Sequence, residues 1–276
     1  MELPAFSTLA TEIADGVLRL TLNRPEVGNA INSAMVRELT DALGAAEGSG
    51  ELRIIVLRGA GENFCVGADI KDVAAAIAAA REGAPDPIRE LSASFGRLCA
   101  AFAATQLATI AMVHGAAMGG GFGLACAADV TIAATNARFG LPETRRGLVP
   151  AQIAPMLIER LGYSRAKLLA VLGGNIRADD ALRLGLVHEV AEDTEAALAS
   201  AASSILACAP GAVAATKKLL RELRSRAPGD AVDLAANVFV EAVRGPEGRE
   251  GMAAFLAKRS PNWAPRTAEK SKPGDA

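Results

Sequence analysis

The chain has 276 residues, 51% of them hydrophobic, and a formal net charge of −2 at neutral pH. This size and composition allow one large buried core, with or without an extension. The charge balance gives no overall field that attracts nucleic acid or an anionic membrane, and no apolar run is long enough to cross a bilayer. The N-terminus lacks a basic stretch followed by an apolar one. We therefore expect a soluble cytoplasmic protein without nucleic-acid or membrane partners.

The hairpin expected near the N-terminus spans residues 9–22, where apolar residues alternate on both sides of Asp15-Gly16, a tight-turn pair. A helix should follow, capped by Asn32 or Ser33, with Val36, Leu39 and Leu43 buried at helical spacing. Strands are then predicted at 53–58, 108–113 and 129–133, and helices at 88–104 and 120–127. This alternation is typical of right-handed βαβ units.

The remainder of the chain is predicted to be helical. Gly83, Pro85 and Pro87 mark a loop before the helix at 88–104. After Val190 no strand pattern remains, and Pro and Gly residues separate four predicted helices, at 195–208, 212–226, 230–244 and 246–258. Periodicity alone thus indicates an α/β region followed by an all-α region.

The cysteines and histidines form no metal or disulfide pattern. We expect all four cysteines to be small buried apolar residues, namely Cys65, Cys99, Cys126 and Cys208. His114 and His188 are expected to be structural.

Three segments concentrate glycines and a carboxylate that could serve a catalytic site. They read Phe-Cys-Val-Gly-Ala-Asp-Ile-Lys at 64–71, Met-Gly-Gly-Gly-Phe-Gly at 118–123 and Phe-Gly-Leu-Pro-Glu at 139–143. A glycine triplet lets the backbone approach a ligand closely and can place an oxygen at a helix N-terminus, although alone it more often marks a tight turn. If Glu143 lies in an apolar pocket, the loss of hydration raises its pKa towards working pH, as an acid/base requires. Alternatively, Glu143 is a carboxylate at a helix N-terminus, where the helix dipole stabilises its negative charge.

In this order the three segments resemble the active-site framework of the crotonase (enoyl-CoA hydratase/isomerase) superfamily. The resemblance implies an α/β fold in which residues 1–195 form a spiral of ββα repeats carrying the active site. It further implies a helical C-terminal trimerisation region at 196–263. The polar composition of the last residues predicts a disordered tail at 264–276. A homotrimer, or a hexamer built as a dimer of trimers, is the expected assembly.

The resemblance also implies that the N–H groups of Ala68 and Gly120 stabilise an enolate oxygen and that Glu143 is the acid/base. The substrate would be an acyl-CoA thioester, with no metal or other cofactor. Matching to the family places the following residues at coenzyme A or substrate: Arg24, Val27, Ala68, Asp69, Ile70, Gly120, Phe255 and Lys258. An acyl pocket would involve Met118, Phe122, Gly123, Arg145 and Arg146.

Gly123 stands where many hydratases of the superfamily have a second catalytic glutamate. A two-carboxylate hydratase holds one water with both side chains, so that mechanism cannot run unaltered here. Glu143 could act alone as in family isomerases, a side chain on the loop after Asp69 could replace the missing acid, or a substrate carboxylate could contribute.

The third route has a local resemblance in its favour. The run from Glu143 to Pro155 is similar to isohexenylglutaconyl-CoA hydratases, which act on carboxylated enoyl-CoAs. Arg145 or Arg146 could pair with such a carboxylate. Both could equally be surface arginines at a helix start or a subunit contact.

The leading hypothesis is an enoyl-CoA hydratase of acyl-CoA or fatty acid metabolism. The runner-up is an enoyl-CoA isomerase that uses Glu143 as its sole base. A third possibility is a protein of another class that binds acyl-CoA without catalysis. The presence of Glu143 argues against it, because a buried carboxylate without a function would cost stability.

Overall fold

The computed structural model describes residues 3–265, and its internal contacts divide the chain between Leu198 and Ala199 into two compact units. The division falls inside helix α7 (Thr194–Leu206). Most of the predicted disordered tail, residues 266–276, lies outside the described residues.

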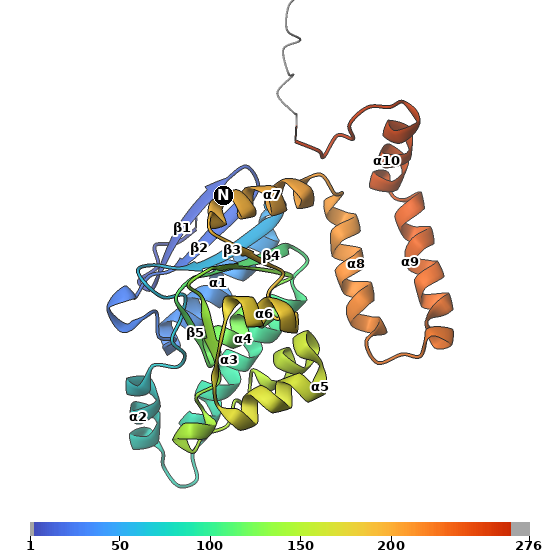
Figure 1. The fold of residues 1–276 in the computed structure, drawn as a ribbon. Helices are drawn as coiled ribbons and strands as arrows, with labels where there is room; N and C mark the ends of the chain where they lie inside the picture. Colours follow the sequence, from blue (N-terminus) through green and yellow to red (C-terminus); the bar gives the residue numbers. More distant parts are fainter. Residues whose placement is uncertain (1–2, 266–276) are drawn as a thin grey trace, which may run out of the picture. The chain divides into compact units, whose positions relative to one another are not determined.

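A six-stranded sheet forms the centre of the first unit, with strand order β1-β2-β3-β4-β6-β9 (Figure 1). The predicted hairpin is confirmed: its two strands pair antiparallel, and every later neighbour in the sheet pairs parallel. All six residues of β4 are buried, as expected for a central parallel strand covered on both faces. The strands are β1 (Leu9–Ala14), β2 (Val17–Leu22), β3 (Ile54–Gly59), β4 (Ala108–Val113), β6 (Val130–Ala134) and β9 (Glu189–Ala191).

Helix α1 (Ser33–Ser49) begins where the sequence predicts. The Oδ1 atom of Asn32 accepts a hydrogen bond of 2.9 Å from the N–H of Met35, which satisfies one of the free donors of the first turn. Its predicted apolar residues are buried. The other helices of this unit are η1 (Pro25–Val27), α2 (Ile70–Ala79), α3 (Pro87–Ala104), α4 (Gly120–Ala127), η2 (Thr144–Arg146), α5 (Ala154–Leu172) and α6 (Ala178–Leu184).

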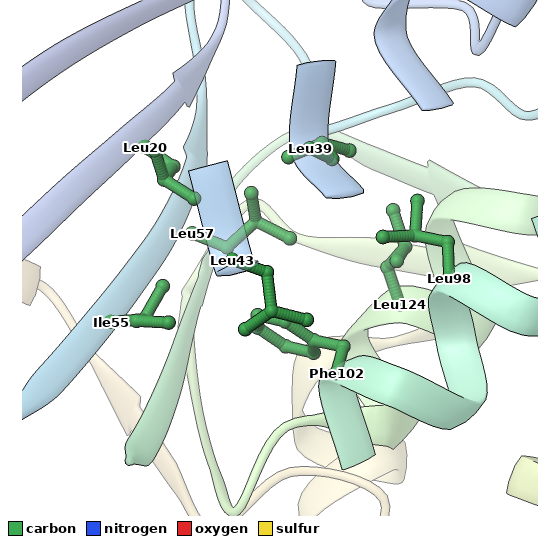
Figure 2. A pocket seen from close by; sticks show the side chains of 8 residues that line it. All are labelled: Leu20, Leu39, Leu43, Ile55, Leu57, Leu98, Phe102 and Leu124. Carbon is green, nitrogen blue, oxygen red and sulfur yellow. The ribbon is translucent and has the colours of Figure 1, made fainter. Parts of the chain in front are cut away.

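The main core lies between β2 and β3 of the sheet and the helices α1, α3 and α4. A small cavity opens inside it, and Figure 2 shows that its lining consists of Leu20, Leu39, Leu43, Ile55, Leu57, Leu98, Phe102 and Leu124. Every lining side chain is apolar, so this cavity offers no polar group for chemistry.

A second sheet was not anticipated from the sequence. It has three short strands in the order β5-β7-β8, comprising β5 (Ala116–Met118), β7 (Arg138–Gly140) and β8 (Asn175–Arg177). β5 pairs parallel with β7, and β7 pairs antiparallel with β8. Because β5 leads into the glycine triplet and β7 leads into Glu143, this sheet sets the separation of two of the three motifs.

The second unit is helical, as periodicity predicts. It begins within α7 and contains four further helices, namely α8 (Pro210–Leu223), η3 (Pro228–Ala231), α9 (Val232–Arg244) and α10 (Pro246–Leu256). Within residues 3–265, no single helix is long and apolar enough to span a membrane. Helices α7 and α8 reach such a length and composition only when taken together, and the pair is bent by 96°.

Candidate active site

The three sequence motifs converge around β5. The N–H of Met118 donates to the carbonyl of Cys65 at 2.9 Å, which fixes the first motif on one side of the strand. On the other side, the N–H of Gly119 donates to the carbonyl of Gly140 at 2.9 Å and fixes the third motif. Backbone hydrogen bonds therefore set the spacing, independently of any bound molecule.

The N–H groups of Ala68 and Gly120 lie on adjoining segments. Ala68 bridges to Ile31, but the bridge uses the N–H groups of Ile31 and Asp69 and leaves the N–H of Ala68 out of it. Gly120 is the first residue of α4, where helical N–H groups have no intrahelical acceptor. A Cβ atom on Gly67 would lie 3.8 Å from the nitrogen of Gly120, so the segment that carries Ala68 adjoins Gly120, as two donors to one oxygen require.

Gly119 is required by the close approach of Glu143. Its φ of +50° lies in the region that disfavours side chains, and a Cβ there would lie 2.5 Å from Glu143 Oε1. The same Cβ would be 3.9 Å from the Cα of Gly67. The Glu143 carboxylate thus lies against Gly119 and close to the Gly67 backbone, the residues that precede the two candidate donors, so the three motifs converge.

Glu143 carries a carboxylate that the surrounding protein stabilises only in part. Its Oε2 atom is buried and has no hydrogen-bond partner among the described residues. Burial raises the pKa of Glu143, against the lowering effects of a backbone hydrogen bond and of the positive charge of Arg146. The side chain makes no capping hydrogen bond to η2, so the alternative role at a helix N-terminus gains no support. A pKa raised above the ordinary glutamate value favours a role in proton transfer.

Ile153 fills the space beside Gly123. A Cβ on Gly123 would overlap Ile153 Cγ2 and lie 2.8 Å from Ile153 Cβ. Ile153 itself is buried. The volume next to this position is therefore occupied by an aliphatic side chain, and a second carboxylate could not stand there without displacing it.

Two of the residues matched to coenzyme A form an ion pair. Arg24 Nη2 lies 2.9 Å from Asp69 Oδ2, and Arg24 Nη1 donates to the carbonyl of Ala30 at 2.7 Å. Asp69 is buried and also caps α2 through the N–H of Lys71. This pair ties the loop after β2 to the first motif. Its contact with coenzyme A stays a prediction.

The other matched residues of the first unit are more exposed. Ile70 is 62% exposed at the start of α2, and Val27 is partly buried in η1. In the second unit, Phe255 is 83% exposed and Lys258 is exposed with a φ of +52° just after α10. Their predicted role at coenzyme A stays a prediction.

The residues predicted for an acyl pocket have different environments. Phe122 is fully buried and packs on Phe139 with ring centroids 5.7 Å apart, whereas Met118 is partly buried. Arg145 and Arg146 are both exposed. Only Arg146 acts electrostatically on Glu143, while the Arg145 side chain runs over Gly173.

Arg160 was missed by sequence reasoning. Its Nη2 atom donates to the carbonyls of Cys126 and Ala128, at the C-terminal end of the helix that Gly120 begins. A cation at this end donates hydrogen bonds to the terminal carbonyls and is attracted by the negative end of the helix dipole. The only local signal is a charged residue within an apolar helical stretch, which gives no indication of its partners.

The histidines have structural contacts, and the cysteines divide into two groups. His114 Nε2 lies 2.9 Å from the carbonyl of Gly61, and His188 Nδ1 accepts from the N–H of Thr131 at 2.9 Å. Burial raises the pKa to about 12 for the thiols of Cys65, Cys99 and Cys126. The expected burial is wrong for Cys208, which is exposed because it follows the last turn of α7. Among residues 3–265, no three His, Cys, Asp or Glu side chains group as metal ligands would.

Residues 12–266 match the family model described as enoyl-CoA hydratase/isomerase. The chain belongs to this family. A probable enoyl-CoA hydratase of Rhodobacter capsulatus is 38% identical over 95% of this chain and 100% of its own length. The 1,2-epoxyphenylacetyl-CoA isomerase of Escherichia coli is 32% identical over 92% of this chain and 97% of its own.

A solved structure of Pseudomonas aeruginosa AtuE has 47% sequence identity and a TM-score of 0.89, covering 94% of this chain and 100% of that one. The crotonase fold expected from the three motifs is therefore confirmed, and the chain is an acyl-CoA-processing enzyme of the hydratase/isomerase family. Relatives of both reaction types are similar over nearly the whole chain, so similarity does not choose between hydration and isomerisation.

Proposed function

We propose that this enzyme hydrates an enoyl-CoA thioester, with Glu143 as the single acid/base. The observation that carries the proposal is the buried Oε2 atom of Glu143, which has no hydrogen-bond partner among the described residues, in a side chain that lies against Gly119. Hydratases among the similar proteins add support. The chemistry is acid/base and needs no resident cofactor beyond the coenzyme A of the substrate.

In this mechanism one proton passes through Glu143. Its carboxylate takes a proton from water as the water oxygen bonds to the β-carbon. The electrons of the double bond move to the thioester oxygen, where the Ala68 and Gly120 N–H groups stabilise the charge; one such donor typically contributes about 3 kcal/mol. The Glu143 carboxyl then returns the proton to the α-carbon as the enolate collapses.

Double-bond isomerisation is the second candidate. The aliphatic side chain of Ile153 beside Gly123 favours it, because a sole base can move a proton between the α- and γ-carbons without holding a water.

Incubation in D2O with crotonyl-CoA, 3-enoyl-CoAs and a glutaconyl-type CoA separates the two reactions. Mass spectrometry should detect the gain of one water on an enoyl-CoA. Double-bond migration or α/γ deuterium exchange without hydration would contradict the hydratase proposal and establish the isomerase. Binding without either reaction would indicate a non-catalytic protein.

We also propose a carboxylated acyl group as one substrate class, with Arg146 as its partner. Arg146 is the arginine that acts on Glu143, and it is exposed and close to the site. Arg146→Ala should raise KM for the glutaconyl-type CoA and leave KM for crotonyl-CoA within about twofold. Arg145→Ala is the matched control, because that side chain lies over Gly173. Equal losses on both substrates would contradict this assignment.

A further inference from the structure

Two glycines inside helices accept two consecutive side chains from the segment before α5. In α3, a Cβ on Gly96 would overlap Gln152 Oε1 and lie 2.8 Å from Gln152 Cδ. In α4, Gly123 accepts Ile153 in the same way. Glycine destabilises a helix interior, but at these two positions the missing side chain leaves the space that residues 152 and 153 occupy. This segment is therefore held in a fixed place.

Residues 152–153 lie near Gly120, one of the two candidate oxyanion donors. Phe95 lies next to Gly96 on α3, and its Cζ atom would be 3.1 Å from a Cβ on Gly120. Gly120 and Gly123 are three residues apart on α4 and share a face. Phe95 and Ile153 therefore flank the face of α4 that begins at Gly120, and Gln152 directly precedes Ile153 in the chain.

The side-chain amide of Gln152 brings a polar group to this segment. Its Nε2 atom donates to Ser92 Oγ at 3.0 Å, and Ser92 lies one turn before Gly96 on the same face of α3. Both residues are partly buried. A side-chain amide has two N–H donors and one accepting oxygen, so after the bond to Ser92 it retains capacity for a further hydrogen bond.

We propose that Gln152, oriented by Ser92, positions the oxygen that becomes bonded to the substrate β-carbon. In hydration that oxygen belongs to the attacking water, and in the reverse reaction to the product hydroxyl. Gln152 stays neutral and takes no proton, since the proton passes from water to Glu143 and then to the α-carbon. The inference rests on the proposed hydratase function and supplies the second contact to water that Gly123 cannot make.

The test compares water addition with proton exchange. Hydration of an enoyl-CoA requires the oxygen to be positioned, whereas α-proton exchange of a saturated acyl-CoA in D2O requires only Glu143 and the two N–H donors. Gln152→Leu should lower kcat for hydration by about tenfold or more, the typical effect of losing one or more active-site hydrogen bonds, and lower exchange far less. A merely structural role would lower both rates together.

Gly96→Ala is the second variant, because its Cβ displaces the Gln152 amide without altering that residue. It should reproduce the selective loss of hydration. Ser94→Ala is the matched control on the same helix, since the Ser94 hydroxyl donates to the carbonyl of Leu91 within α3, and it should leave both rates unchanged. Thermal unfolding of every variant identifies those that fail to fold.

Three outcomes would overturn the inference. Hydration that Gln152→Leu and Gly96→Ala leave unchanged, or hydration and exchange that fall equally, would remove the role of Gln152 while the hydratase function stands. A wild-type enzyme that exchanges protons but adds no water would remove the hydratase function, and this inference with it.

Discussion

Glu143 combines a buried oxygen without a hydrogen-bond partner and a raised pKa, both of which cost folding free energy. A position under no functional demand would not retain such a group. We expect Glu143→Gln to lower kcat by about 10²- to 10⁴-fold, the usual contribution of a positioned acid or base. Calorimetric titration with acyl-CoA should find binding retained. Unchanged turnover would exclude Glu143 as the acid/base.

The same substitution should alter stability in a pH-dependent way. A carboxyl with a raised pKa in the folded state contributes most stability below its unfolded pKa and loses that contribution as pH rises through its folded pKa. Glu143→Gln, which never ionises, should therefore raise the free energy of unfolding at pH 7 relative to wild type. At pH 4 the two proteins should differ less. Denaturant titrations at both pH values measure this, and a larger gain at pH 4 would contradict it.

Because the acid/base of hydration must be ionised to accept a proton from water, the raised pKa also affects the rate. The acid limb of kcat/KM should lie above the ordinary glutamate value of about 4.3. A pH–rate profile between pH 4 and 8 measures it. An acid limb at or below that value would mean that another group is titrating.

At the level of helices, the contact of Gly123 with Ile153 is the most easily disturbed. Gly123→Ala would force a Cβ into the isoleucine and should destabilise the fold by about 1–3 kcal/mol, as overpacking does. Ile153→Ala opens that space, so the double variant should be more stable than the sum of the two single effects predicts. Denaturant unfolding of the four proteins measures the coupling. Strict additivity would place the two residues out of contact.

The success of the sequence predictions differs with the length of the element. The hairpin and α1 were predicted because alternation and helical spacing continue over several turns or residue pairs. The strands β5, β7 and β8 have three residues each, too few for a period to be recognised. Their order depends on tertiary pairing, which no local pattern reports.

The site divides in the same way. The convergence of Gly120 and Glu143 could be predicted because each lies in a short motif whose residues are adjacent in sequence. The contacts of Gln152 with α3, Ile153 with α4 and Arg160 with the end of α4 join distant segments through single side chains. Only the folded backbone brings these pairs together, so composition and spacing could not indicate them.

For the whole molecule, the second unit exposes large apolar side chains on α8, α9 and α10. They include Leu220, Val232, Phe239, Met252, Phe255 and Leu256. Large apolar side chains that are exposed to solvent typically mark an interface where they adjoin one another. We therefore keep the homotrimer, or a hexamer built from two trimers, as a prediction.

Light scattering coupled to size exclusion tests this assembly. The wild type should elute with three or six times the mass of one chain. Phe239→Asp and Phe255→Asp should lower the mass, whereas Lys218→Ala on α8, an exposed residue, should not. A monomeric wild type would contradict the prediction.

The placement of the cysteines also matters to anyone handling the protein. Three thiols are buried with pKa values of about 12, and the thiolate that reacts with maleimides is scarce at neutral pH in such groups. Cys208 is exposed in the second unit. A fluorophore added to the native chain would thus attach at one defined point, and the enzyme can be labelled for single-molecule or anisotropy measurements without any engineered cysteine.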